Sequence, residues 1–519
     1  MNRRSFITAL GAVVTQRQLR RWRDEYGEFG LEDPVLGLAT PAVTTTRYPY
    51  VQNLRSDRIS VLWAALESGT GIVEYSSDGI NFNGVTARSR TFTAAETGMA
   101  KDFVQYQANI TGLQPGTDYL YRVSVNGLEV TPGGDMRFRT AGPGPFNFIV
   151  LGDSGYASPE QYAIAQKILA EKPALVIHTG DLVYNPGGAP GTNIDLYQRN
   201  YFNYYYQTMS SVPFFPTIGN HDYGPTAAPY MAVHALPTEN VPPGDRHKYY
   251  SFDWSNVHFI SLDGHESLER AVTAGGPMLQ WLENDLRSTR QFWRIVYLHY
   301  PPFAAGPNMN DYHSAFVRDK LVPIFENYGV QIVLTGHEHS YQRSRPIRKS
   351  AFVSSDVGTN YISSGGGGAF LYPVYPLPVV AFGQGRADNA FHYLHAEVRE
   401  TRITFRAIRY DGIEIDTYTV APRPAFSDDP TVSPVVMTPG PTAGATVRIL
   451  GRALAAEETF ACTPVPPTEM GGTTVTVNGN PIQLLYVSDS QIYAQLPFSV
   501  DGNVTIRVTT ANGSSEMSF

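Results

Sequence analysis

The sequence contains only one cysteine, Cys462, among its 519 residues. A disulfide framework within the chain is therefore excluded, and so is a zinc ribbon built on cysteine thiolates. The sequence also lacks an uncharged apolar run of the roughly 18 residues that a transmembrane helix requires, so no transmembrane segment is expected. Any metal site in this chain has to use the side chains of His, Asp, Glu, Asn or Tyr.

The chain also lacks an excess of positive charge. Asp and Glu number 47 against 39 Lys and Arg, which gives a formal net charge of −8. A protein that binds a nucleic-acid backbone needs a basic face, so we do not expect such a partner. Hydrophobic residues make up 42% of the chain, which is enough for buried cores. At roughly 150 residues per domain, the length predicts two to four domains.

Paired arginines and a short apolar run open the chain, at Arg3-Arg4 and residues 6–14. This arrangement resembles a twin-arginine export signal, so we expect residues 1–42 to be an export signal and N-terminal segment. The protein would then act in the periplasm or outside the cell. The apolar run is short, a second basic stretch follows at residues 17–23, and no clean Ala-x-Ala cleavage site is present. The alternative interpretation is a basic N-terminal tail.

Residues 43–141 have the pattern of a small β-sandwich. Runs that alternate apolar and polar residues recur, for example at residues 59–63 and 117–125, and turn residues such as Ser77-Asp78-Gly79 separate them. The string at residues 113–123 resembles fibronectin type III domains. We therefore expect a fibronectin type III-like domain in front of the rest of the chain.

Residues 145–420 change to a pattern in which strands and helices alternate. Residues 146–151 form a continuous apolar run that ends in Gly152-Asp153, as a buried strand would. Ser158-Pro159 then predicts the start of a helix, because Ser is a favourable N-cap and Pro suits the first helical position. Further apolar runs lie at residues 175–178, 294–298 and 331–334, with helical patterns at 277–287 and about 314–328. This alternation predicts an α/β sandwich of the βαβαβ type.

After residue 420 the pattern returns to β-strands. Residues 421–441 are rich in proline and are predicted to be a linker, and alternating strands follow at 472–479 and 503–509. Residues 442–519 resemble the Ig-like β-sandwich domains that are appended to secreted bacterial proteins, which suggests contact with the cell surface. The chain is thus predicted to be multidomain, with an α/β sandwich flanked by two all-β sandwich domains.

Five short blocks of the α/β region carry side chains that can bind metal ions. Four of them follow predicted buried strands, and a polar residue at the carboxyl end of such a strand points into a crevice. The blocks are Gly152-Asp153-Ser154-Gly155, Gly180-Asp181-Leu182-Val183-Tyr184, Gly219-Asn220-His221-Asp222, Val296-Tyr297-Leu298-His299 and Gly336-His337-Glu338-His339. One Gly-Asp pair alone would be read as a turn, but five ordered blocks predict a metal site.

The set and order of these blocks resemble the purple acid phosphatases, a metallophosphoesterase family with a dinuclear metal centre, over roughly residues 47–420. The resemblance implies that Asp181 bridges two ions. It implies Fe(III) in the first site and a divalent ion, Fe, Zn or Mn, in the second. The implied ligands of the first site are Asp153, Asp181, Tyr184 and His339, and those of the second are Asp181, Asn220, His299 and His337.

The ligand types also indicate this chemistry directly. Oxygen and imidazole donors suit hard or borderline ions, and no thiolate is present to select soft ones. Asp153, Asp181 and a Tyr184 phenolate would supply three negative charges, so a trivalent and a divalent ion leave an excess of positive charge that favours a phosphate anion. Two ions can clamp the attacking and leaving oxygens of an in-line displacement and can acidify a bound water to a pKa near 7.

Two further histidines are candidates for catalysis. His221 follows Asn220 directly, and the resemblance implies that it contacts the substrate phosphate and assists the leaving group. The alternative for His221 is a structural role in its loop. His313 lies 14 residues after His299, a spacing that differs from the family's, so an exposed loop histidine is the alternative. The family's His-x-Pro-x-Tyr string ends here in Phe303, which removes a hydroxyl.

Other polar residues of these blocks are expected to play supporting parts. Asp222 is expected to support a histidine rather than bind metal, and Glu338 is expected to point away from the ions. His178 and His258 lie in strand patterns and are expected in or near the core. The aromatic residues 201–206 are expected to pack against the sheet, with stacking on an aromatic leaving group as the alternative.

The leading functional hypothesis is an exported hydrolase that cleaves phosphate monoesters with a dinuclear metal centre and metal-bound hydroxide. The first alternative is a phosphodiesterase or nucleotidase that uses the same site. The second is a non-catalytic cell-surface binding protein. This last alternative is weakened because vestigial sites lose ligands, and none of the seven is missing here.

Overall fold

The computed structural model describes residues 43–130, 134–185, 193–223, 227–265, 276–353, 358–375, 385–421, 425–426, 435–437, 446–461, 463, 465–497 and 504–518. The predicted export segment, most of the predicted linker and Cys462 lie outside these residues. No helix in the described part of the chain is long and apolar enough to cross a membrane.

Two antiparallel sheets form the N-terminal domain, as the alternating runs predict. One has the order β1-β2-β6-β5, and the other pairs β4-β3-β7 with β8 and β9 beside β7. Trp63, Val73 and Tyr121 are buried between them. The strands are β1 (Thr45–Gln52), β2 (Arg58–Ala65), β3 (Gly71–Ser76), β4 (Asn83–Thr86), β5 (Arg88–Phe92), β6 (Phe103–Thr111), β7 (Asp118–Val125), β8 (Leu128–Glu129) and β9 (Met136–Arg139).

Two mixed sheets form the central domain. Their orders are β12-β11-β10-β22-β23-β24 and β13-β14-β15-β16-β20-β17-β21. The parallel strands are β10 (Phe146–Leu151), β11 (Leu175–His178) and β12 (Phe214–Pro216) in the first sheet, and β14 (Val257–Ser261), β15 (Trp293–Tyr297), β16 (Ile332–Thr335) and β20 (Asn360–Ser364) in the second. The antiparallel strands are β22 (His392–Val398), β23 (Ile403–Arg409), β24 (Glu414–Val420), β13 (Tyr250–Trp254), β17 (Tyr341–Arg343) and β21 (Arg386–Asp388).

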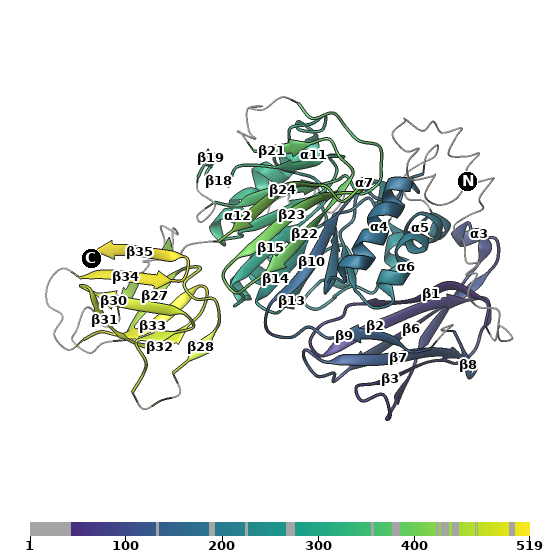
Figure 1. The fold of residues 1–519 in the computed structure, drawn as a ribbon, viewed down its shortest axis with the longest axis horizontal. Helices are drawn as coiled ribbons and strands as arrows, with labels where there is room; N and C mark the ends of the chain where they lie inside the picture. Colours follow the sequence, from purple (N-terminus) through teal and green to yellow (C-terminus); the bar gives the residue numbers. More distant parts are fainter. Residues whose placement is uncertain are drawn as a thin grey trace.

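The two sheets face each other and helices cover their outer faces, which confirms the predicted α/β sandwich (Figure 1). Between the sheets, the rings of Phe215 and Phe252 stack with centroids 3.8 Å apart, and Phe148 meets Phe259 edge-on at 5.3 Å. The covering helices include α4 (Pro159–Glu171) and α6 (Asn203–Met209) on the first sheet, and α10 (Pro277–Ser288) and α12 (Val322–Asn327) on the second.

Helix α4 begins where its sequence signals predict. The Ser158 side chain accepts a hydrogen bond of 3.1 Å from the backbone N–H of Gln161. Pro159 occupies the first helical position, where a backbone N–H would have no partner within the helix, so proline costs no hydrogen bond there. Ile164 and Ile168 are fully buried against the sheet. The cap thus fixes the helix that follows the first metal-ligand block.

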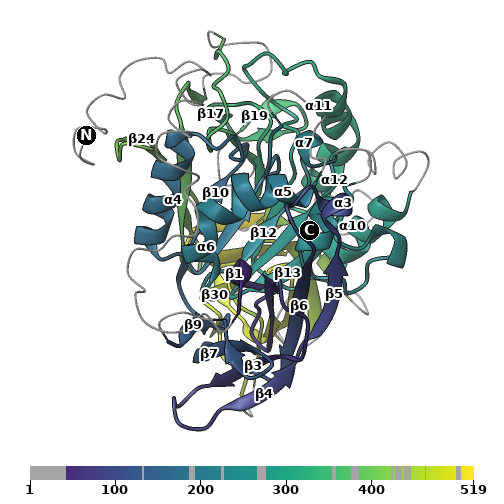
Figure 2. The same cartoon turned by 90° about the vertical axis from the view of Figure 1, so that its right-hand side faces the viewer.

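The N-terminal domain shares a continuous core with the central domain, and its strand β1 contacts α6 (Figure 2). Arg47 of β1 is only 2% exposed and donates to Gln105 of its own domain and to Gln198 of the central domain, at 2.9 Å each. Its guanidinium lies 4.3 Å from the ring centroid of Phe202. A buried charge with these partners holds the two domains in register.

A β-sandwich closes the chain, which confirms the predicted C-terminal domain. Its core includes Ile449, Val475 and Ile506. A buried ion pair attaches it to the central domain, because Arg294 at the start of β15 lies 2.5 Å from Asp489. The main strands are β27 (Thr446–Arg452), β32 (Gln483–Val487) and β33 (Gln491–Gln495) in one sheet, and β30 (Thr473–Val477), β34 (Thr505–Thr510) and β35 (Gly513–Ser518) in the other.

Candidate metal centre

The predicted metal ligands follow the carboxyl ends of strands in both central sheets. In the first sheet, Leu151 of β10 is opposite His178 of β11, so Asp153 and Asp181 leave the sheet side by side. Asn220 follows β12 and begins the short helix α7 (Asn220–Tyr223). In the second sheet, His299 follows β15 and His337 follows β16, and these two strands are parallel neighbours. The docked C-terminal domain contacts the opposite end of β15, away from these residues.

The backbone is strained at three of these positions. Asp153, Asp181 and His337 have φ angles of +58°, +54° and +67°, in the left-handed region that non-glycine residues seldom adopt. Such conformations cost about 1–3 kcal/mol each and persist where the surrounding structure imposes them. The strain turns all three side chains away from their strands and into one site.

Glycines next to the ligands allow the segments of the site to approach closely. A Cβ atom at Gly219 would lie 2.1 Å from the Asp181 carboxylate. A Cβ at Gly365 would lie 2.2 Å from the carbonyl oxygen of Glu338 and 2.8 Å from the Asp153 carboxylate. Gly365 follows β20, so the loop after this strand can lie directly against the segments of Asp153 and Glu338.

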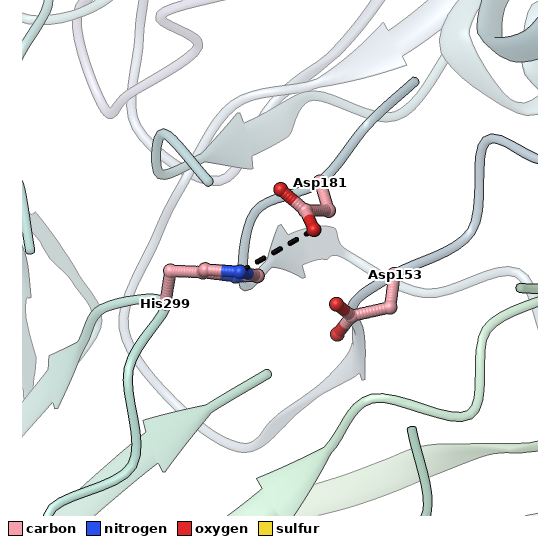
Figure 3. Close-up of side chains that lie close together, drawn as sticks. All are labelled: Asp153, Asp181 and His299. Atoms are coloured by element: carbon pink, nitrogen blue, oxygen red, sulfur yellow. Dashed lines mark ion pairs between the residues drawn. The ribbon is translucent and has the colours of Figure 1, made fainter. Parts of the chain in front are cut away.

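Asp153, Asp181 and His299 form the centre of the cluster (Figure 3). Their ligand atoms all lie within 4.8 Å of one another, and the three residues are at most 1% exposed. The Nε2 atom of His299 lies 3.4 Å from Asp181 Oδ2. Burial disfavours the imidazolium, but the Asp181 carboxylate outweighs it and raises the pKa of His299 to about 9.

The charge of this cluster fits bound cations. Among the described residues, no Lys or Arg side chain pairs with Asp153 or Asp181; their charged neighbours are His339 and His299. Two buried carboxylates without a permanent cation are costly, because the desolvation of each ion costs several kcal/mol. Metal ions at this position would offset that cost, and the donor set of carboxylate, imidazole, amide and phenol suits them.

Tyr184 joins the two carboxylates to a third histidine. Its hydroxyl lies 3.1 Å from Asp153 Oδ1, 2.9 Å from Asp181 Oδ2 and 3.0 Å from His339 Nε2. Burial, together with the Asp153 and Asp181 carboxylates, raises the pKa of Tyr184 well above its usual value. The phenol therefore stays protonated unless a cation lies beside it.

His299 links the remaining ligands. Its Nε2 atom lies 3.0 Å from Asn220 Oδ1 and 3.2 Å from His337 Nδ1, while its Nδ1 atom lies 2.9 Å from the carbonyl oxygen of Thr179. Because a carbonyl oxygen can only accept, the Thr179 contact requires a proton on Nδ1 of His299. The Nε2 atom then faces the cluster. All seven predicted ligands thus belong to one connected set of polar contacts.

An aromatic rim borders the side of the site that holds His339. The His339 Nδ1 atom lies 2.7 Å from the carbonyl oxygen of Phe370, and its ring stacks on Tyr372 with centroids 4.0 Å apart. The Phe370 ring is 54% exposed and meets Tyr156 and Tyr372 edge-on. An aromatic group of a bound ligand could pack on this exposed ring.

His221 is placed beside the cluster rather than within it. Its backbone N–H donates to Asp181 Oδ1 at 2.8 Å, and its ring centroid lies 4.4 Å from that of Tyr184. The ring therefore lies beside the predicted ligands.

His313 belongs to an aromatic stack on the His337 side. Its ring lies 4.5 Å from Tyr300 and 4.9 Å from His265, both in near-parallel orientation. Tyr300 in turn lies 4.6 Å from His337. His265, which was not among the predicted site residues, also belongs to this stack, and its Nδ1 atom lies 2.7 Å from the Tyr300 hydroxyl. His265 lies in the loop after β14, which ends at Ser261, and no local pattern of the sequence marks it.

Of the two acids next to the ligands, Glu338 points as expected, but the expectation that Asp222 supports a histidine is wrong for the described residues. Asp222 is buried and accepts hydrogen bonds from the backbone N–H groups of Leu182 and Gly219 and from the Tyr197 hydroxyl. It therefore ties the loop of Asp181 to the loop of Asn220. Glu338 points away from the cluster and accepts from the backbone N–H of Asn308 at 2.7 Å.

The residues that were expected in the core lie there. His178 is fully buried and contacts Ser154, and burial lowers its pKa to about 3. His258 lies between Asp253 and Asp285, at 2.6 and 2.8 Å. Residues 201, 202 and 205 are buried against the first sheet. Phe303, which stands where the family's string has a tyrosine, packs on Tyr361 in the core.

Comparison with protein-family models agrees with this architecture. Residues 146–341 match the model described as calcineurin-like phosphoesterase, residues 48–140 match the purple acid phosphatase N-terminal domain, and residues 430–519 match the IPT/TIG domain.

Known relatives and structures include several phosphatases. The chain is 28% identical over 338 residues to an uncharacterized protein of Mycobacterium tuberculosis, covering 54% of this chain and 62% of that protein. It is 25% identical to acid phosphatase type 7 of Mus musculus, covering 50% and 61% of the two chains, and to purple acid phosphatase 15 of Arabidopsis thaliana, covering 51% and 53%. The chain thus matches less than two thirds of the length of these relatives.

The structure of purple acid phosphatase PPD1 from yellow lupin superposes with a TM-score of 0.61 at 19% identity, covering 72% of this chain and 74% of that chain, which supports the fold.

Proposed function

We propose that the chain is an exported hydrolase of phosphate monoesters with a dinuclear metal centre. Its residues 146–341 match the calcineurin-like phosphoesterase model, and residues 48–140 match the purple acid phosphatase N-terminal domain. One observation carries the proposal. The seven side chains that match the family's ligand set come from five separate segments, and their polar contacts join them into one cluster.

The proposed ions are Fe(III) in the first site and divalent Fe, Zn or Mn in the second. Asp153, Tyr184 and His339 would hold the first ion, Asn220, His299 and His337 would hold the second, and Asp181 would contact both. When bound, such a pair polarises the phosphate ester and acidifies water.

The protein's own groups would orient the substrate and move a proton. We assign His221 to the phosphate, because its ring lies beside Tyr184 while its backbone N–H is fixed on Asp181. A protonated imidazole there can give its proton to the leaving oxygen. We assign His313 to the other side of the substrate, next to Tyr300 and His337. The exposed Phe370 ring offers a surface for an aromatic leaving group.

A comparison of two chromogenic esters tests the proposed reaction. The metal-loaded chain is expected to hydrolyse p-nitrophenyl phosphate with a higher kcat/KM than bis-p-nitrophenyl phosphate, because a monoester dianion suits the positive charge of the loaded site better. A higher kcat/KM for the diester would favour the phosphodiesterase alternative. Absence of turnover with either ester in a chain that holds two ions would favour the non-catalytic alternative.

Export is proposed from Arg3-Arg4 and the apolar run behind them. A reporter joined to residues 1–45 should be exported by the twin-arginine route, which carries folded proteins and so allows metal loading before export. Replacing Arg3 and Arg4 together by Lys should retain the reporter in the cytoplasm. Export that survives the double substitution would contradict the proposal.

A further inference from the structure

Asp311 lies against the metal centre, although it is not among the seven predicted ligands. Its Oδ2 atom lies 2.9 Å from His337 Nε2. The other ring nitrogen of His337, Nδ1, lies 3.2 Å from His299 Nε2 and faces the cluster. Asp311 therefore contacts the outer side of a ligand whose inner side faces the second metal site.

We infer that Asp311 is a positioning residue that fixes His337 with Nδ1 toward the second metal ion. A carboxylate accepts a hydrogen bond only from a protonated nitrogen, so this contact places the His337 proton on Nε2 and leaves the Nδ1 lone pair for an ion. Carboxylates that hold a ligating histidine in this way orient its ring and make it more basic.

The position of Asp311 is itself fixed by its surroundings. Asp311 caps the helix α11 (Tyr312–Phe316), because its Oδ1 atom accepts from the backbone N–H of His313 at 2.7 Å. The loop before it is attached to the ligand block by Glu338, which accepts from Asn308 N–H, and Asp311 N–H donates to the Asn308 carbonyl oxygen at 2.9 Å. Glu338 thus holds the loop that carries Asp311.

Asp311 also contacts a second histidine of the site. Its Oδ1 atom also lies 3.4 Å from His313 Nδ1, so one acid contacts both a predicted metal ligand and a candidate substrate histidine.

The inference rests on the proposed metal centre but does not depend on phosphatase activity. Loss of a carboxylate that orients a ligating histidine lowers metal affinity by about 10- to 100-fold. We expect Asp311→Ala to weaken zinc at the second site by that factor and to leave the first site unchanged. Asp311→Asn, which keeps a good N-cap and removes the charge, should fall between Asp311→Ala and the wild type.

Zinc titration against a chelator of known affinity, with metal counted after dialysis, measures both sites in the full chain. The matched control is Asp319→Ala. Asp319 is exposed and lies in η3 (Val317–Leu321), which follows α11 directly, so this variant should bind both ions as the wild type does. Unchanged affinity at the second site in Asp311→Asn and Asp311→Ala would overturn the inference. If Asp311→Ala does not fold by circular dichroism, Asp311→Asn decides alone.

The outcomes also separate this inference from the proposed function. A chain that binds two ions, shows the Asp311 effect and hydrolyses no ester would retain the positioning role and refute the phosphatase assignment. An active chain whose Asp311 variants bind both ions as tightly as the wild type would support the phosphatase assignment and refute the positioning role.

Discussion

Replacing His299 with Ala is expected to remove the second metal ion and abolish turnover while the fold survives. His299 is fully buried at the cluster, and its Nε2 atom joins Asp181, Asn220 and His337. Its loss removes one ligand and the contact that aligns two others. Asn220→Ala should act in the same direction, because Asn220 Oδ1 offers a ligand to the same ion. Metal content per chain, turnover of p-nitrophenyl phosphate and the circular-dichroism spectrum are the measurements, and metal content should fall by about half if the two ions bind separately.

His221→Ala provides the matched comparison, since its ring lies beside the ligands without belonging to them. It should keep both ions and lower turnover by about 10² to 10⁴, the usual contribution of a general acid. Substitution of His395 in β22, which contacts Asn147 away from the cluster, should change neither quantity. Full activity in His299→Ala or Asn220→Ala would refute the ligand assignment. An unchanged rate in His221→Ala would leave that residue with a structural role.

The local patterns of the sequence were sufficient to predict the strands that carry the site. The apolar run at residues 146–151 became β10, and Ser158-Pro159 became the capped start of α4, because both features depend on neighbours in the chain. The antiparallel strand β22 could not be foreseen in this way. It pairs with β10 across more than 240 residues, and such long-range pairing leaves no local periodicity.

In the candidate site, too, the features that depend on local sequence could be predicted and those that depend on long-range contacts could not. Asp153 and Asp181 could be predicted as neighbours, since carboxyl ends of parallel strands meet at one edge of a sheet. The supporting residues could not, because Asp311 and His265 lie in loops whose position depends on contacts such as that between Glu338 and Asn308. The ion pair of Arg294 and Asp489 was equally hidden, because its partners belong to domains that the sequence separates by almost 200 residues.

Tyr184→Phe is expected to bleach an iron-loaded protein that is otherwise violet to pink. A phenolate bound to Fe(III) absorbs visible light by transferring charge to the metal, and the resemblance to purple acid phosphatases implies this role for Tyr184. The hydroxyl is placed for it, at 3.1 Å from Asp153, 2.9 Å from Asp181 and 3.0 Å from His339. Burial and the two carboxylates raise the pKa of Tyr184, so only a strongly charged cation can ionise it. The visible band should therefore be absent from the metal-free chain and appear when Fe(III) is added.

Phe keeps the ring that packs on His221 and Tyr156, so the substitution removes the oxygen donor with little change in packing. It should weaken iron binding more than zinc binding, because a phenolate favours the trivalent ion. Tyr372→Phe is the control. Tyr372 stacks on His339 at 4.0 Å, and no hydrogen bond from its hydroxyl to Asp153 or Asp181 is present among the described residues, so the colour should remain. Absorption spectra and iron and zinc contents of the three chains are the measurements. An active, iron-loaded wild type without a visible band would instead place Tyr184 in a packing role, and the centre would then be a colourless di-zinc or di-manganese site of the wider metallophosphoesterase group.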